Sequence, residues 1–225
     1  MSTCEELLKR QKEPHQPEGR AKRVDQVDLH LFSQLHPQGR TLIRDFAKRA
    51  NDGKQCADHE CFEPFIFGWM AMNGWAACVT QKEFDGEYVR TLARDESLEH
   101  RFRERLDACD EFRKVTQKFR ALWPIFRSQD VRSIPNPIGT REEIVREYGR
   151  TVPEARYSPA CYFRHELEGS IIPADWPHTV CAIYQVRCNL FHGFKGLYSE
   201  NDTAIVSAGF RVLVHVIQML KLQAD

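Results

Sequence analysis

The sequence of 225 residues has no excess of either charge, because 32 lysines and arginines are matched by 32 aspartates and glutamates. A protein that coats nucleic acid or binds an anionic membrane surface normally carries a basic excess. The balance therefore excludes a broad basic surface as the basis of function. It leaves room for a small, local cationic site.

Long uninterrupted hydrophobic runs are also missing. The most apolar stretch, residues 62–79, contains Glu63 and Asn73 and falls short of the ~20 predominantly apolar residues of a membrane-spanning helix. The first residues have neither the basic start nor the apolar region of a secretory signal. We therefore expect a cytoplasmic protein with no membrane partner.

Nucleotide-binding glycine loops are absent, both Gly-x4-Gly-Lys-Ser/Thr and Gly-x-Gly-x-x-Gly after a strand, so we expect no cofactor. The eight cysteines are scattered, and several lie among apolar residues, which is typical of reduced thiols in a cytoplasm. A zinc site could use Cys56, His59 and Cys61, but a fourth ligand with suitable spacing is missing. The alternative, which we favour, is a polar loop with incidental cysteines and no metal.

Strand-like alternation is absent too, and the apolar periodicity is helical. Residues 1–26 are polar without periodicity, and we expect them to form a disordered arm. The remaining residues, 27–225, are expected to form a single helical domain. Its predicted fold is all-α, an antiparallel helical bundle with additional short helices. The core helices are predicted at about residues 62–80, 97–126, 175–192 and 202–222.

The segment 97–126 has the clearest pattern, because its apolar residues recur at steps of three and four. It predicts one amphipathic helix of up to roughly eight turns. Ser97 is the candidate N-cap, and Pro124 is expected to disturb the end.

Shorter features flank these core helices. A short helix is predicted over residues 41–50, bracketed by Gly39 and Gly53. Residues 127–174 contain five prolines and predict a long, irregular excursion. Within it, Thr140 and Glu143 match a capping box that begins one more short helix.

A polar cluster interrupts the end of the apolar helix at 175–192. In the structural interpretation Arg187 faces solvent, His192 caps the helix and Lys195 is an exposed loop residue. In the functional interpretation Arg187 and His192 act together. They lie about 140° apart around the helix, so they converge only if the last turn unwinds or a second chain completes the site.

An arginine and a histidine that do converge are suited to cleaving a phosphodiester. Histidine exchanges protons near neutral pH, so it can take a proton from a ribose 2′-hydroxyl or give one to a leaving oxygen. The planar guanidinium of arginine offers several donors to phosphate oxygens. This chemistry requires no metal.

The string from Val186 to Lys195 contains an Arg-x4-His element followed by Gly193 and resembles the signature of the HEPN superfamily (higher eukaryotes and prokaryotes nucleotide-binding). The upstream run from Phe65 to Asn73 is similar to the aromatic Trp-x-x-x-Asn helix of many prokaryotic members. In architecture the resemblance covers roughly residues 60–222, and these two stretches are its specific part.

The resemblance implies a homodimer in which two Arg-x4-His elements form a composite site, and a metal-independent endoribonuclease that cleaves single-stranded RNA by 2′-hydroxyl attack. It also implies a toxin or defence effector that an antitoxin or another protein partner holds in check. Carried over by position, Arg187 would stabilise the transition-state phosphate and His192 would be the general acid or base. Asn189 and Asn73 would support them, and Lys195 would bind an RNA phosphate.

Two positions depart from the family pattern. Cys188 follows the arginine where active members often carry a polar residue, and Phe194 stands where some toxins have a tyrosine that receives AMP. That modification is therefore not expected here. The alternative function is a non-catalytic HEPN-like module that binds RNA, nucleotide or a protein partner through the same cluster. A plain helical scaffold is the third.

Overall fold

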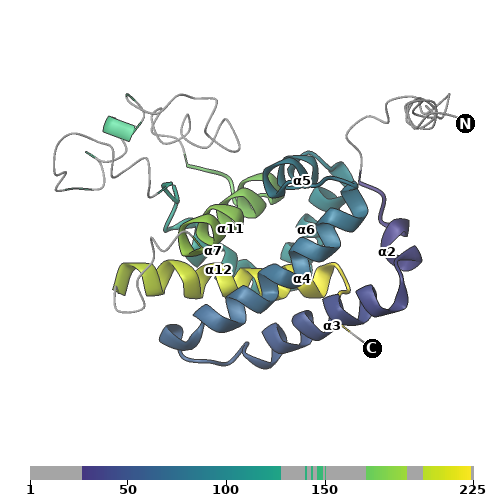
Figure 1. Ribbon diagram of the computed structural model, residues 1–225. Helices are drawn as coiled ribbons and strands as arrows, with labels where there is room; N and C mark the ends of the chain where they lie inside the picture. Colours follow the sequence, from purple (N-terminus) through teal and green to yellow (C-terminus); the bar gives the residue numbers. More distant parts are fainter. Residues whose placement is uncertain are drawn as a thin grey trace, which may run out of the picture.

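The computed structural model describes residues 27–127, 140, 143, 146–148, 150, 171–191 and 200–223. This described part contains nine helices and no strand (Figure 1). The helices pack against one another around one hydrophobic core, which confirms the predicted all-α bundle. The predicted arm at 1–26 and most of the excursion at 127–174 lie outside the described residues.

The central helix is α4 (Phe62–Thr80), which packs against both α3 (Pro37–Asp52) and α12 (Glu200–Met219) (Figure 1). Its bounds match the predicted 62–80, and it is buried on most faces. Gly68 permits the close approach of α12, because a Cβ there would lie only 3.0 Å from the Leu213 side chain. A larger residue would push the two helices apart.

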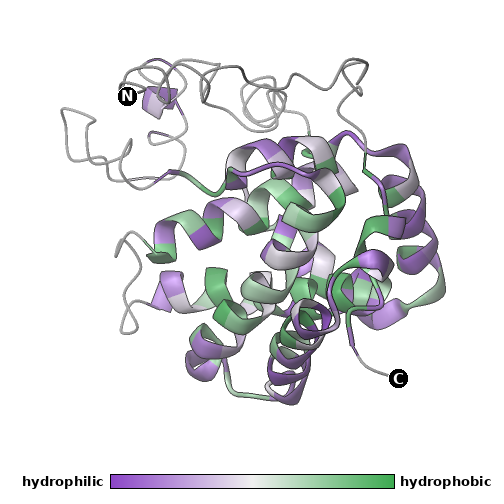
Figure 2. Cartoon of the chain, turned by 45° about the vertical axis from the view of Figure 1, so that its right-hand side comes forward, coloured by the Kyte–Doolittle hydropathy of each residue, from purple (hydrophilic) through white to green (hydrophobic). Residues whose placement is uncertain are grey.

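The last two predicted core helices, 175–192 and 202–222, are present as α11 (Trp176–Phe191) and α12. The helix α11 follows its predicted bounds closely, whereas α12 ends three residues before the predicted 222. Figure 2 shows hydrophobic residues (green) gathered toward the interior of the bundle and hydrophilic residues (purple) on its outer sides. The periodicity therefore predicted which helix faces are buried.

The prediction of one helix over 97–126 is wrong, because α6 (Glu96–Ala108) and α7 (Asp110–Arg120) are separated at Cys109. Cys109 is extended, with φ −135° and ψ 103°. The break lets Phe102 and Phe112 pack edge to face with ring centroids 5.2 Å apart. In one continuous helix these residues would stand ~15 Å apart along the axis.

Local bonds stabilise this break. The Arg113 side chain donates to the carbonyl oxygens of Leu106 and Asp107, both at 3.1 Å, and so satisfies the end of α6. At the start of α6 the N-cap is Asp95, whose carboxylate accepts from the Leu98 N–H at 2.9 Å. The prediction of Ser97 as the cap is therefore also wrong.

The shorter helices were predicted only in part. The predicted helix at 41–50 is the middle of α3, which begins earlier because Pro37 suits a first helical position and His36 caps it. The predicted capping box is confirmed, since Thr140 N and Glu143 Oε2 lie 3.0 Å apart and the reverse bond is 3.3 Å. Three elements were not predicted: α2 (His30–Gln34), η1 (Asp58–Glu60) and α5 (Asp85–Ala93).

From its sequence, the chain was expected to contain no membrane-spanning helix. In the part of the chain that the structure describes, none is both long and apolar enough to span a bilayer.

Candidate active site

Arg187 projects from α11, one turn before that helix ends at Phe191, and pairs with the first residue of α5. Its Nη2 lies 2.7 Å from Oδ2 of Asp85. The two side chains are only 23% and 27% exposed. An ion pair this close and mostly shielded from solvent is little screened by salt, so it holds the guanidinium and ties α11 to α5.

Two aromatic rings add to the fixation of Arg187. Its guanidinium carbon lies 5.7 Å from the ring centroid of Trp69 on α4 and 4.9 Å from that of Phe191. Trp69 is buried, whereas Phe191 is half exposed. Cation–π contacts of this kind stabilise the charge without neutralising it. The guanidinium is therefore held from three helices: α4, α5 and α11.

Two tyrosines surround the ion pair but do not add charge to it. Burial, and secondarily the nearby Asp85 carboxylate, raises the pKa of Tyr88 far above its ordinary value. Burial, and secondarily the neighbouring Cys188, likewise raises the pKa of Tyr184. The Tyr184 ring also packs on Trp69, with centroids 5.9 Å apart. Both phenols are neutral near pH 7, so they cannot act as bases here.

Several polar atoms near Arg187 are buried without a hydrogen-bond partner among the described residues. They are Arg187 Nε, Trp69 Nε1, Tyr88 Oη and Asn73 Oδ1. Asn73 lies one helical turn beyond Trp69 on α4, so these atoms come from the same side of the bundle. Buried polar groups usually have partners, and unpaired ones mark places where a ligand or water fits. No hydrogen bond joins Asn73 to Arg187 in the described part.

Asn189 does not meet Arg187. It is buried, and its Nδ2 donates to the carbonyl oxygen of Phe126 at 2.7 Å, while its Oδ1 accepts from Gln185 at 3.1 Å. Two residues along a helix turn the side chain by about 200°, which places Asn189 on the face opposite to Arg187. In the structure its contacts anchor α11 to the chain that follows α7.

The other two predicted site residues, His192 and Lys195, lie outside the described residues. His192 comes directly after Phe191, whose ring lies beside the Arg187 guanidinium. The structure thus describes the arginine of the predicted pair and the end of the helix that leads to the histidine.

Asp85 is the site residue that the sequence analysis missed. The available signal was Asp85 and Glu87 in a first helical turn, followed by the apolar residues Tyr88, Val89 and Leu92 at helical spacing. That signal predicts a short helix. Its pairing with a residue about one hundred positions away depends on the tertiary fold.

The cysteines of the zinc alternative lie close together, with Cys56 Sγ and Cys61 Sγ 3.0 Å apart. His59 does not join them, because its side chain is 73% exposed and faces Glu60. Burial raises the pKa of Cys61 to about 12, so without a metal its thiol is protonated at neutral pH. Within the described residues, no three His, Cys, Asp or Glu side chains are grouped so as to hold a metal ion.

Comparisons with known proteins add no assignment: no family model, no curated protein and no solved structure matches this chain.

Proposed function

We propose that this chain is a metal-independent endoribonuclease of the HEPN type that cleaves single-stranded RNA. The observation that supports the proposal most is the state of the Arg187 guanidinium. Asp85, Trp69 and Phe191 hold it in a partly exposed position, and its Nε is buried without a partner. A guanidinium held in this way can offer the N–H donors of its exposed part to a phosphate oxygen.

In the proposed reaction, His192 takes the proton of the ribose 2′-hydroxyl while the 2′-oxygen attacks the adjacent phosphorus. Arg187 donates hydrogen bonds to the non-bridging oxygens, whose negative charge grows in the transition state. The bond from phosphorus to the 5′-oxygen then breaks, and that oxygen receives a proton. The products are a 2′,3′-cyclic phosphate and a 5′-hydroxyl.

The proposal includes a homodimer, because one Arg-x4-His element supplies a single histidine and the reaction needs both an acid and a base. His192 of the partner subunit would be the second proton carrier. Asn73 is the proposed supporting residue, Asn189 acts only by holding α11 in place through Phe126, and Lys195 is the proposed contact to a neighbouring phosphate. We further propose a cytoplasmic toxin or defence effector that an antitoxin or another protein partner restrains.

The test is cleavage of a labelled single-stranded RNA by the full chain in EDTA. We expect cleavage by the unchanged protein and a loss of at least about hundredfold in His192→Ala, because general acid–base catalysis contributes about that much or more. His100→Ala is the matched control, because His100 is 70% exposed on α6 and far from His192 in the sequence. Equal cleavage by His192→Ala and His100→Ala would contradict the proposal.

A specific observation also favours a second candidate function, a non-catalytic module that binds RNA, nucleotide or a protein partner. Asp85 already neutralises Arg187 at 2.7 Å, so an incoming phosphate competes with a carboxylate. This candidate predicts RNA binding that weakens with salt and with Arg187→Ala, without cleavage at any pH. Filter binding in parallel with the cleavage assay separates the two functions.

A further inference from the structure

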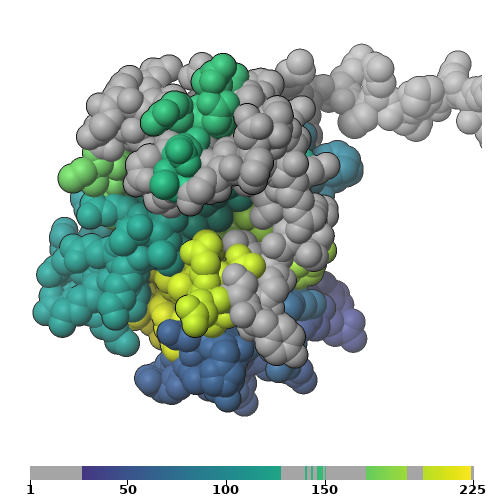
Figure 3. Space-filling view, turned by 90° about the vertical axis from the view of Figure 1, so that its left-hand side faces the viewer, coloured from purple at the N-terminus to yellow at the C-terminus, as the bar shows by residue number. Residues whose placement is uncertain are grey.

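A cavity of about 150 Å³ lies away from Arg187, where α6, α7 and α12 meet the residues that follow α3. Figure 3 shows α6 and α7 (teal) beside α12 (yellow) and the blue region between α3 and α4 on one face of the molecule. One water needs roughly 10–15 Å³, so the cavity has room for a group of several heavy atoms. Its lining includes Lys54, Arg105, Glu111, Arg211, His215 and Gln218.

Positive side chains outnumber negative ones in this lining. Lys54, Arg105 and Arg211 contribute three positive charges and Glu111 one negative charge. A second carboxylate, Asp58, lies outside the lining, 3.7 Å from Arg211, so the surroundings still carry a positive excess. The whole chain has equal numbers of basic and acidic residues, so this concentration of cations is local. Cations that line a concave site raise the local concentration of anions.

Two nitrogen atoms of the lining residues are buried without a hydrogen-bond partner among the described residues: Arg105 Nε and His215 Nδ1. The His215 side chain is more than nine-tenths buried and packs on Phe112, with ring centroids 5.0 Å apart. Leaving such atoms unpaired costs about 1–3 kcal/mol each. An acceptor oxygen of a ligand satisfies Arg105 Nε, and it satisfies His215 Nδ1 in the tautomer in which that nitrogen carries the imidazole proton.

The arginines of the cavity are fixed by the surrounding chain. Arg211 donates to the carbonyl oxygens of Lys54 and Cys56, and Arg105 Nη2 donates to Gln218 Oε1 at 3.0 Å. Because these bonds occupy only part of each guanidinium, the remaining donors stay available. A preorganised site of this kind loses little side-chain entropy on binding.

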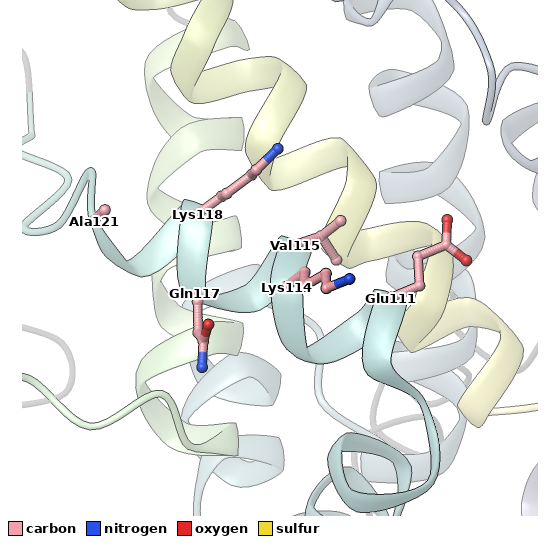
Figure 4. Close-up of a pocket in the computed structure, with 6 residues that line it drawn as sticks. All are labelled: Glu111, Lys114, Val115, Gln117, Lys118 and Ala121. Atoms are coloured by element: carbon pink, nitrogen blue, oxygen red, sulfur yellow. The ribbon is translucent and has the colours of Figure 1, made fainter.

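The cavity continues into an open groove along α7, with which it shares Glu111 and Val115. Figure 4 shows Glu111, Val115 and Lys118 directed toward α12, whereas Gln117 points away from it. The groove gives room to a ligand larger than the group in the cavity. The Glu111 carboxylate, at the junction, is suited to accept hydrogen bonds from hydroxyl groups of that larger part.

We propose that this cavity binds the phosphoryl group of a small phosphate monoester or of free phosphate. A phosphoryl group carries about two negative charges and three strong acceptor oxygens, which match the three cations and the two unpaired nitrogens. The groove and Glu111 favour an ester whose organic part bears hydroxyls. The site is independent of the proposed ribonuclease activity, because its residues come from other helices than those around Arg187.

The test is isothermal titration calorimetry on the full chain, with inorganic phosphate, ribose 5-phosphate and ribose as probes. We expect both phosphates to bind and ribose alone not to bind. Lys54→Gln and Arg105→Gln should each weaken phosphate binding about tenfold, the usual value of a charge-assisted bond. Tighter binding of ribose 5-phosphate than of phosphate identifies the ester as the ligand, and equal binding identifies free phosphate.

Arg103→Gln is the matched control, because it removes the same charge from α6 at a side chain that is 67% exposed and outside the lining. It should leave phosphate affinity unchanged. If Arg105→Gln does not fold, amide chemical-shift mapping of the unchanged protein decides, since phosphate should shift residues around Lys54 and His215. Absence of binding by both phosphates, or equal weakening by Arg103→Gln, would overturn the proposal.

Discussion

The Arg187 site and the cavity beside His215 both hold arginine side chains in fixed positions, but their electrostatics differ. Arg187 has a carboxylate partner at 2.7 Å and two aromatic rings around it. The lining of the cavity holds Lys54, Arg105 and Arg211 with one carboxylate, Glu111, and Asp58 outside the lining lies 3.7 Å from Arg211. One site is balanced within itself, and the other keeps an excess of positive charge.

This difference in charge suits the two sites to different roles toward phosphate: stabilising a transition state or binding a stable anion. A balanced site binds a phosphate weakly in the ground state, and its guanidinium stabilises charge that grows during a reaction. A site with excess positive charge binds a stable anion tightly. We therefore propose catalysis for Arg187 and ligand binding for the cavity.

The largest expected effect is a loss of stability from a substitution beside Arg187 that leaves the cavity untouched. Trp69→Ala removes a buried ring that supports Arg187, and we expect it to lower the free energy of unfolding by about 3–5 kcal/mol. Urea denaturation measures the change. Phosphate binding under native conditions should persist, because Trp69 does not line the cavity. A loss below about 1 kcal/mol would show that the ring is not part of the core.

The second prediction concerns the ion pair. Asp85→Asn leaves the half-buried Arg187 without its counter-charge, and we expect a loss of about 1–3 kcal/mol in unfolding free energy. Asp110→Asn is the matched control, because Asp110 also begins a helix and pairs with Arg113 at 2.8 Å, but with 80% exposure. Its loss should be about 0–1 kcal/mol. Equal losses in chemical denaturation would mean that burial does not strengthen the Arg187 pair.

The third prediction concerns the negative charge of the cavity, whereas Lys54→Gln and Arg105→Gln each remove a positive charge. Glu111→Gln removes the one carboxylate of the lining, so inorganic phosphate should bind about fivefold more tightly. Calorimetry measures the affinity at constant salt. Unchanged or weaker phosphate binding would contradict the electrostatic account of the cavity.

The smallest expected effect is a pH dependence. Burial, and secondarily Arg105 and Lys54, lowers the pKa of His215 below its ordinary value of 6.5, and the Glu111 carboxylate opposes this shift. The unfolded chain therefore binds the proton more readily, so stability should fall as the pH drops below about 6.5. The slope from this group is at most about 1.4 kcal/mol per pH unit. His215→Gln should flatten the curve, and parallel curves would exclude the effect.

Periodicity predicted the central helices because their burial is a local property of the sequence. The helix α4 is apolar on most faces, and α11 and α12 alternate between core and surface at helical spacing. The break at Cys109 was not predictable in this way. The helical spacing continues through it, and only the packing of Phe102 on Phe112 in three dimensions explains why the chain turns.

The candidate site was predictable only for the residues of one helix. Arg187 stood out because it interrupts an apolar segment, whereas Asp85 lies in an unremarkable polar turn. The lining of the cavity comes from four segments between Lys54 and Gln218, so no local pattern could reveal it. The placement of Asn189 opposite to Arg187 follows from helix geometry, but its bond to Phe126 does not.

The measurement that tests the central proposal most directly is cleavage, in EDTA, of an RNA oligonucleotide with a single 2′-deoxy substitution. The nucleotide 5′ to the mapped cut is the one substituted. The account predicts that the unsubstituted RNA yields a 2′,3′-cyclic phosphate end and that the 2′-deoxy substitution blocks cleavage at that position. Cleavage that persists at the 2′-deoxy position, or that occurs only with added divalent metal, would contradict it.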